Sequence, residues 1–418
     1  MAVVGVLVGL AVLGAVAGFH RYAWCRLVRD TTAGPGPARR AGTVVFVAGP
    51  LLMLAALVSG RAGAPFPLQR VLAWPGYLWL AFSLYLLLAL LAAELPRPLA
   101  RRWAERPRPE GVRDLGEEDV RNPVGGADGS DLAERDVPGL SEQVASRRLF
   151  VSRVVGGAVA AAAVGTVGHG MYGVLRGPGV KRVTVPLAKL PRAAHGFRIA
   201  VVSDIHLGPI LGRDFARRVV DTVNATQPDL IAVVGDLVDG GVEDLGPAAA
   251  PLAGLRARHG TYFVTGNHEY FSGADQWVDH VRELGLRPLR NARTELPWFD
   301  LAGVDDVAGD SEGEGPDFAR ALGDRDRARA SVLLAHQPVV IHDAVEYGVD
   351  LQLSGHTHGG QLWPGNHVAD LANPTLAGLE RYGDTQLYVS RGAGAWGPPV
   401  RVGAPSDITV VELASRHA

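Results

Sequence analysis

The sequence predicts an N-terminal region of about four transmembrane helices followed by an α/β domain. Apolar residues are concentrated in the first 175 of the 418 positions. Four segments there contain no Asp, Glu, Lys or Arg, and each approaches or exceeds the roughly 20 apolar residues that a helix needs to cross a bilayer. Beyond position 183, short apolar runs alternate with segments whose apolar residues recur at helical spacing, which is typical of an α/β domain.

The four apolar segments are residues 1–19, 41–60, 71–93 and 154–175. The fourth is rich in alanine and glycine and only mildly apolar. These lengths favour membrane-spanning helices, and the alternative for each is a helix buried in a protein core. No basic residue precedes the first segment, which argues against a cleaved signal peptide. We therefore expect three transmembrane helices in residues 1–93 and a fourth in residues 154–175.

The distribution of arginine predicts the orientation of these spans, because loops rich in Arg and Lys stay in the cytoplasm. The loop between the first two spans contains five arginines and one acidic residue, which places the N-terminus outside. Both ends of residues 94–153 are also basic, and the middle is rich in Asp, Glu, Gly and Pro, as in a disordered linker. We expect this linker in the cytoplasm and everything after Leu175 on the extracytoplasmic side.

A pair of arginines precedes the fourth span. Arg147 and Arg148 stand in the motif SRRLF, which resembles a twin-arginine export signal. Such a signal would bring the protein to the twin-arginine export machinery as a folded, cofactor-loaded domain. The alternative is that the pair only follows the preference for basic residues on the cytoplasmic side. No A-x-A-like cleavage site follows, so we expect the span to remain as an anchor.

The predicted α/β domain covers residues 183–418 and contains eight apolar runs of strand length. Alternation of such runs with helical segments favours a sheet that is buried on both faces. The runs lie at residues 198–206, 230–239, 261–269, 298–306, 331–338, 350–360, 386–392 and 407–413. Helical spacing of apolar residues predicts helices at residues 214–225 and 275–284.

Five of these runs end in residues that bind metal ions, in the sequences D-I-H, G-D-L-V-D, G-N-H-E, A-H-Q and G-H-T-H-G. In α/β domains, functional sites gather beyond the carboxyl ends of strands. A single Asp or His at such a place is usually a helix cap or a solvated loop residue, but five such endings in order indicate one shared site. The predicted ligands are Asp204, His206, Asp236, Asn267, His336, His356 and His358.

This ligand set predicts two divalent ions and a phosphate ester substrate. Asp204 and His206 are two residues apart, so an extended backbone would direct both side chains to one ion. Asp236 has two carboxylate oxygens and can bridge two ions. Two divalent ions and two carboxylates leave a net positive charge, which stabilises the negative charge that develops on a phosphate ester. Gly359 and Gly360 allow the backbone to turn tightly beside the two histidines of H-T-H-G-G.

The ordered motifs D-x-H, G-D-x-x-D, G-N-H-[DE], H and G-H-x-H resemble the calcineurin-like metallophosphoesterase superfamily. The segments SGHTHGGQ, LAGVDD and GAGAWGPPVR resemble its membrane-associated bacterial branch. The resemblance covers residues 183–413 and implies two stacked mixed β-sheets flanked by helices in a four-layer sandwich. It implies one ion on Asp204, His206, Asp236 and His358, and the other on Asp236, Asn267, His336 and His356.

The resemblance also assigns a role to His268, which would bind phosphate and protonate the leaving group. The sequence departs from the family at Gly240, where many members have an arginine. This departure removes one expected phosphate contact and weakens any inference about the substrate class.

Four residues near the motifs have two interpretations each. Asp239 and Glu269 either order the metal ligands from behind or serve as turn and cap carboxylates. Trp363 and Trp396 either line the mouth of the cleft, where they touch an apolar part of the substrate, or pack in the core.

The sequence therefore predicts a membrane-anchored, dinuclear metal-dependent phosphohydrolase that cleaves a phosphodiester or phosphomonoester with a metal-activated hydroxide. The oxygen and nitrogen donors favour Mn²⁺ or Fe, with Zn²⁺ as a further candidate. Because the domain is anchored, its candidate substrates are a lipid head group, a cell-wall polymer and an extracytoplasmic nucleotide.

Two other functions are compatible with the same fold: a non-catalytic extracytoplasmic binding or scaffolding module, and a nuclease. A module that had lost catalysis should lack some ligands, whereas all seven are present together with His268. The net charge of −2 and the lack of a basic stripe argue against nucleic acid. The single cysteine, Cys25, excludes an intrachain disulfide and a cysteine-rich metal site.

Overall fold

The computed structural model describes residues 2–98 and 138–416. Within these residues, four helices are long and apolar enough to cross a membrane, judged by length and composition. They are α1 (Ala2–Trp24), which continues into the π-helix η1 (Cys25–Arg29), α2 (Pro37–Ser59), α3 (Phe66–Glu94) and α5 (Pro138–Leu175). Each apolar segment predicted from the sequence overlaps one of these helices.

Helix α5 begins earlier than the predicted linker allows. The sequence predicts a linker over residues 94–153, whereas α5 starts at Pro138 and already contains Arg147 and Arg148. Proline fits the first turn of a helix because the backbone N–H that it lacks has no partner there. The arginine pair therefore lies within a helix that runs without a break into the fourth apolar segment. The acidic middle of the predicted linker lies outside the described residues.

The chain divides into two compact units. One comprises residues 1–48 and 84–163, and the other comprises residues 49–83 and 164–418. The second unit contains the entire α/β domain, so the candidate site belongs to this unit.

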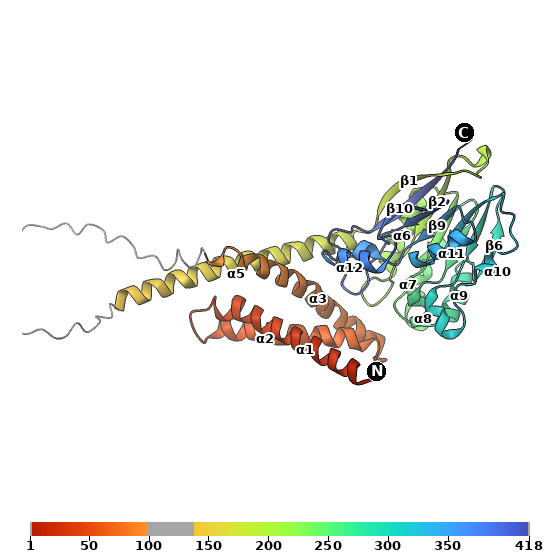
Figure 1. The fold of residues 1–418 in the computed structure, drawn as a ribbon. Coiled ribbons are helices and arrows are strands. Elements are labelled where there is room, and N and C mark those ends of the chain that lie inside the picture. The colour runs from red at the N-terminus through yellow and green to blue at the C-terminus, as the bar shows by residue number, and fades with distance from the viewer. Residues whose placement is uncertain (1, 99–137, 417–418) are drawn as a thin grey trace, which may run out of the picture. The chain divides into compact units, whose positions relative to one another are not determined.

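The α/β domain contains two six-stranded sheets, and in the first of them the first and last strands of the domain lie side by side (Figure 1). Its strands, in spatial order, are β1 (Gly179–Leu187), β12 (Asp407–Ser415), β2 (Phe197–Val202), β3 (Leu230–Val234), β4 (Thr261–Val264) and β5 (Arg287–Pro288). All neighbours are parallel except β12 and β2. Strand β1 is not among the predicted strands, and it pairs with β12 along its whole length.

The second sheet is also mixed. Its strands, in spatial order, are β10 (Gly378–Tyr382), β11 (Thr385–Val389), β9 (Leu351–Ser354), β8 (Ala330–Leu334), β7 (Phe299–Gly303) and β6 (Ala292–Glu295). The central strands β11, β9, β8 and β7 are parallel, and the two edge pairs are antiparallel.

Apolar side chains from both sheets form the central core. Ile199 and Ala200 show the arrangement, because neighbouring residues of a strand point to opposite faces. Ile199 belongs to the core shared with the second sheet, and Ala200 belongs to the core beneath the helices. Helices α6 (Arg213–Ala225), α7 (Val242–Ala249) and α9 (Ala274–Glu283) cover the first sheet, and α10 (Phe318–Leu322) and α11 (Ile341–Glu346) cover the second. Two mixed sheets flanked by helices confirm the predicted fold class.

Short helical segments complete the domain. They are α8 (Asn267–Ser272), α12 (Gly365–Ala372) and the 3₁₀ turns η2 (Arg192–Ala194), η3 (Ala250–Gly254), η4 (Val307–Glu312), η5 (Pro338–Val340) and η6 (His358–Gly360).

All eight predicted strands and both predicted helices exist, but the strands end before the polar motif residues. The strand predicted over residues 261–269 is wrong beyond Val264, because Asn267 begins α8. Gly266 is the N-cap of this helix, and the Glu269 carboxylate accepts the Gly266 backbone N–H at 2.6 Å. That bond is half of a capping box, and it starts a helix where the sequence suggests a continuing strand.

Candidate metal centre

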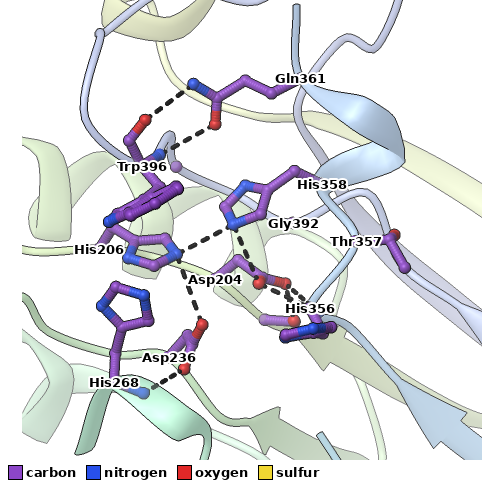
Figure 2. Close-up of polar contacts among 12 residues, drawn as sticks. Asp204, His206, Asp236, His268, His356, Thr357, His358, Gln361, Gly392 and Trp396 are labelled. Carbon is purple, nitrogen blue, oxygen red and sulfur yellow. Dashed lines mark hydrogen bonds and ion pairs between the residues drawn. The ribbon is translucent and has the colours of Figure 1, made fainter. Parts of the chain in front are cut away.

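The candidate site lies in the loops beyond the carboxyl ends of β2, β3, β4, β8 and β9 (Figure 2). Five predicted ligands there adopt positive φ angles: Asp204 (52°), His206 (49°), Asp236 (53°), His356 (74°) and His358 (53°). Non-glycine residues rarely adopt this conformation, which costs of order 1 kcal/mol or more each and persists where the surrounding structure imposes it. The expected extended backbone at Asp204 and His206 is therefore wrong. Left-handed turns, rather than strand alternation, direct these side chains into the site.

One cluster of potential ligand atoms comes from Asp204, His206 and His358. The Nε2 atoms of the two histidines are 3.0 Å apart, and His358 Nε2 lies 3.3 Å from Asp204 Oδ1. Two nitrogen ligands about 2.1 Å from one ion and at right angles would be about 3.0 Å apart. Two imidazole lone pairs at this separation repel each other unless a cation or a proton lies between them. The arrangement fits a metal ion.

A second cluster comes from Asp236, His336 and His356, with Asn267 beside it. His336 Nδ1 donates to the Val234 carbonyl at 2.9 Å, so its Nε2 faces the site. Burial opposes protonation of this ring, but Asp236 raises the pKa of His336 well above its usual value, so a proton and a metal ion compete for its Nε2. This Nε2 is buried without a hydrogen-bond partner, 3.1 Å from Asp236 Oδ2. His356 Nδ1 lies 3.0 Å from Asn267 Oδ1. A cation would satisfy the unpaired nitrogen and the carboxylate together, so these residues also fit a metal ion.

Asp236 lies between the two clusters. Its Oδ2 is 3.1 Å from His336 Nε2 in one cluster and 3.7 Å from His206 Nε2 in the other. Burial alone would raise the pKa of this carboxyl, but His336 and His206 lower it below its usual value, so it is ionised. A single anionic carboxylate thus faces both groups of donors.

The electrostatics of the site favour positive charge at its centre. Burial opposes protonation of His206, yet Asp239 and Asp236 raise the pKa of its imidazole to about 9. Burial and the neighbouring His336 lower the pKa of His356 to about 4, which leaves that ring as a neutral ligand at physiological pH. Burial and His206 likewise lower the pKa of His358. Protons and metal ions therefore compete for the same lone pairs.

Asp239 connects a predicted ligand to the predicted acid. Its Oδ1 accepts hydrogen bonds from His206 Nδ1 at 2.8 Å and from His268 Nδ1 at 2.7 Å. Burial raises the pKa of the Asp239 carboxyl, but the two histidines outweigh burial and lower it to about 2. Each imidazole is thereby held through its Nδ1, which leaves its Nε2 for another partner. Asp239 thus contacts two imidazoles of the candidate site, and its role in ordering metal ligands stays a prediction.

Glu269 holds the loop that carries Asp236. Its two carboxylate oxygens accept the backbone N–H groups of Asp236 (3.0 Å), Leu237 (2.8 Å) and Gly266 (2.6 Å). Burial, followed by repulsion from Asp236, raises the pKa of Glu269 to about 7. The side chain caps α8 and also holds the backbone of the Asp236 loop, whereas its role in ordering metal ligands stays a prediction.

Arg401, which no sequence motif assigns to the site, is buried behind His358. Its Nη1 donates to the His358 carbonyl at 3.0 Å, and its Nη2 lies 3.1 Å from His358 Nδ1. Burial lowers the pKa of Arg401 to about 10, so the guanidinium still carries its charge at neutral pH. The signal was present in the segment GAGAWGPPVR, which resembles the family, but the sequence does not indicate where this arginine points.

The same segment passes close to the first ligand loop. Gly392 has a φ of 82°, and a Cβ there would lie 2.6 Å from the Asp204 Cβ. The backbone N–H of Gly394 donates to the Asp204 carbonyl at 2.8 Å. Larger residues at these positions would push the loop away from Asp204.

Trp396 is held at the edge of the site by Gln361 (Figure 2). Gln361 Nε2 donates to the Trp396 carbonyl at 2.9 Å, and the Trp396 N–H donates to Gln361 Oε1 at 3.0 Å. The Trp396 ring centre lies 5.7 Å from that of His268. Trp396 and Trp363 are 53% and 49% exposed, so the alternative of core packing is wrong for both.

The glycines singled out in the sequence are Gly359 and Gly360, predicted to form a tight turn, and Gly240. Gly359 and Gly360 have φ angles of 59° and 79°, as expected for a tight turn after His358. A Cβ at Gly360 would lie 2.2 Å from the Asn366 Cα, so this position needs glycine for space as well. Gly240 has no side chain at the position after Asp239 where, by the resemblance given above, many members of the superfamily have an arginine.

This chain is similar to proteins and to a family model that are described as phosphoesterases. A family model described as calcineurin-like phosphoesterase matches residues 197–360. Two proteins named "Transmembrane protein with metallophosphoesterase domain", from Danio rerio and Bos taurus, are 38% and 39% identical over 59% and 58% of this chain. The matches span 59% of the length of each of these relatives. An uncharacterized metallophosphoesterase from Helicobacter pylori is 38% identical over 61% of this chain and 69% of its own length.

Proposed function

This chain belongs to the calcineurin-like metallophosphoesterase family, and on that premise we propose that it hydrolyses a phosphoester with two divalent metal ions. The observation that supports the proposal most strongly is the position of Asp236. One ionised carboxylate faces His336 at 3.1 Å and His206 at 3.7 Å, each within a separate group of donors. A bridging carboxylate of this kind is what a two-metal site requires.

The ligands divide between the two ions as follows. Asp204, His206, Asp236 and His358 would hold one ion, and Asp236, Asn267, His336 and His356 would hold the other. The bound ions would supply an activated water as nucleophile and would neutralise charge on the phosphate. The mixture of carboxylate, amide and imidazole donors favours Mn²⁺ or Fe, with Zn²⁺ as a further candidate.

His268 would serve as the general acid. Asp239 holds its Nδ1, so the Nε2 that remains can bind a phosphate oxygen and give a proton to the leaving group. The backbone N–H of His268 donates to Asp236 Oδ1 at 2.9 Å, which fixes the start of α8 against the bridging carboxylate. Glu269 fixes the same loop from the other side through the backbone of Asp236 and Leu237.

We further propose that the four apolar helices anchor the protein in a membrane, with the α/β domain on the extracytoplasmic side. The lengths of the helices support anchoring, and the arginines between α1 and α2 support the orientation. The twin-arginine machinery would then be one route for export of a domain that folds with its metal ions.

The test replaces the bridging carboxylate in the full-length protein. Asp236→Ala should lose most bound metal, because each ion loses a ligand, and nearly all activity on p-nitrophenyl phosphate and bis-p-nitrophenyl phosphate with Mn²⁺. Elemental analysis and product release measure the two effects, and the exposed Asp221→Ala on α6 is the matched control. Full metal occupancy in Asp236→Ala would refute the two-ion assignment, and an inactive, metal-loaded wild type would refute the phosphohydrolase.

A further inference from the structure

The α/β domain is attached to the last apolar helix without a flexible linker. Helix α5 ends at Leu175 and β1 begins at Gly179, so three residues separate them. The Gly177 N–H donates to the Val174 carbonyl at 3.0 Å, and the Gly179 N–H donates to the Ser406 carbonyl at 3.1 Å. Backbone hydrogen bonds therefore continue across the junction. The domain is held at the end of the helix rather than tethered at a distance.

A short chain of contacts leads from this helix to the candidate metal centre. The Arg401 N–H donates to the Gly170 carbonyl of α5 at 3.3 Å, and the Arg401 side chain donates to the His358 carbonyl. The approach is close, because a Cβ at Gly170 would lie 2.7 Å from the Arg401 carbonyl oxygen. Gly170 lies five residues before the end of α5. One arginine thus spans the distance between a membrane helix and a proposed metal ligand.

Two exposed aromatic rings lie beside His268. Phe271 is 74% exposed, and its ring centre lies 5.5 Å from that of His268. Trp396 lies at 5.7 Å and is fixed there by Gln361. Removing an exposed aromatic ring from water lowers the free energy, and two such rings lie beside the residue proposed to face the leaving group. They favour a substrate whose leaving group has an apolar part.

Apolar side chains are also exposed on α12, which starts beside the loop that touches α5. The Trp363 N–H donates to the carbonyl of Val402, the neighbour of Arg401, at 2.9 Å. Trp363, just before α12, is exposed. Val368 and Leu371 on α12 are exposed as well, and Leu371 is 90% exposed. Tryptophan and an apolar helix face are typical of the bilayer interface. This side of the domain is therefore suited to contact lipid.

A cavity of about 690 Å³ adjoins His268 within the unit formed by residues 49–83 and 164–418. Asp239, Phe271 and Trp396 line one part of it, and Phe66 and Tyr77 of α3 line another. Gly240 also lines this cavity. The space is large enough for a drug-sized molecule and is bounded by apolar groups from a membrane helix.

Resting on the phosphohydrolase activity proposed above, we infer that the substrate is a phosphoester of a membrane lipid, cleaved at the surface of the bilayer. The phosphate would enter between the ligand clusters, and the lipid part would pass between Phe271 and Trp396 toward the cavity. Water attacks phosphorus, the bond from phosphorus to the lipid oxygen breaks, and His268 gives its proton to that oxygen. The products are a lipid alcohol and a phosphate that carries any second substituent.

The first experiment measures how hydrolysis depends on chain length. Full-length protein in lipid nanodiscs with Mn²⁺ receives ethyl, butyl, hexyl and octyl phosphate, and the corresponding methyl diesters, so that both ester classes are represented. Alcohol release gives kcat/KM. We expect kcat/KM to rise with chain length by up to about fourfold for each methylene fully removed from water. Trp396→Ala and Phe271→Ala should flatten this gradient, Trp396→Phe should retain most of it, and the remote exposed Val180→Ala should retain all of it.

The second experiment separates membrane lipid from a soluble apolar ester. Phosphatidic acid and phosphatidylglycerol, a monoester and a diester, are placed either in the nanodisc that holds the protein or in separate vesicles. We expect hydrolysis of lipid in the same bilayer only, because the site is held close to the end of α5.

The outcomes are distinguishable. Activity on p-nitrophenyl esters without a chain-length gradient, or a gradient that survives Trp396→Ala and Phe271→Ala, would overturn the inference. A gradient without hydrolysis of lipid in the same bilayer would also overturn it, in favour of a soluble apolar ester. A metal-loaded protein that cleaves none of the esters would instead refute the proposed function.

Discussion

The pair formed by Asp239 and His268 gives the sharpest test of the proposed chemistry. General acid catalysis typically contributes about 10²–10⁴-fold, or roughly 3–5 kcal/mol of barrier. His268→Ala should therefore lose about 10²-fold or more on an alkyl ester, whose leaving group needs a proton, and much less on a p-nitrophenyl ester. Metal content should stay unchanged, because the side chain of His268 is outside the two proposed ligand sets.

Asp239→Asn removes the charge that holds His268 while keeping the shape of the side chain. A hydrogen bond to a charged group contributes about 1.5–3 kcal/mol, and Asp239 accepts two, at 2.8 Å from His206 and at 2.7 Å from His268. Both contacts fall on the same oxygen, Oδ1, so the amide oxygen of asparagine can still accept both, but each bond loses the contribution of the negative charge. We expect kcat/KM to fall by about 10–100-fold, which is the usual effect of replacing a residue that orients metal ligands.

The double variant decides whether the two residues act together. If Asp239 acts through His268, then adding Asp239→Asn to His268→Ala should reduce activity further only by the contribution of the bond to His206. The coupling energy between the two substitutions should then reach about 0.5–3 kcal/mol. The assay is kcat/KM on alkyl and p-nitrophenyl esters, with metal content measured in parallel. Additive losses would refute the coupling. Equal losses on both esters in a metal-loaded His268→Ala would show that His268 binds phosphate and is not the acid.

Three further predictions concern the loop support, the orientation and export. Glu269→Gln leaves one acceptor oxygen for three backbone N–H groups, so the free energy of unfolding should fall by about 1–3 kcal/mol. A lower Tm would show this loss. The control is the exposed Glu283→Gln, whose Tm should not change, and an unchanged Tm for Glu269→Gln would contradict the supporting role. Protease added to intact spheroplasts should cleave after Leu175, whereas protection until lysis would reverse the orientation. Lysine at both Arg147 and Arg148 should impair export if they form a twin-arginine signal, and normal export would leave them as basic flanking residues.

The sequence by itself determined the chemistry of the site and the class of fold. Strand periodicity and the donor types at strand ends are local properties, so Asp204, Asp236 and His336 could be proposed as neighbours without coordinates. The carboxyl ends of parallel strands gather at one edge of a sheet, and this rule brings distant motifs together. The apolar lengths of the N-terminal segments likewise required no tertiary information.

Only the tertiary structure decided how these residues reach each other. The positive φ angles at Asp204 and His206 are not preferred by either residue, so packing around them imposes a turn that local patterns do not predict. The capping contact that turns Asn267 into the start of α8 is equally invisible from strand periodicity. Arg401 lies 43 residues from His358 and contacts both that histidine and α5. Contacts of this kind depend on how side chains pack across the folded domain, and therefore no spacing in the sequence encodes them.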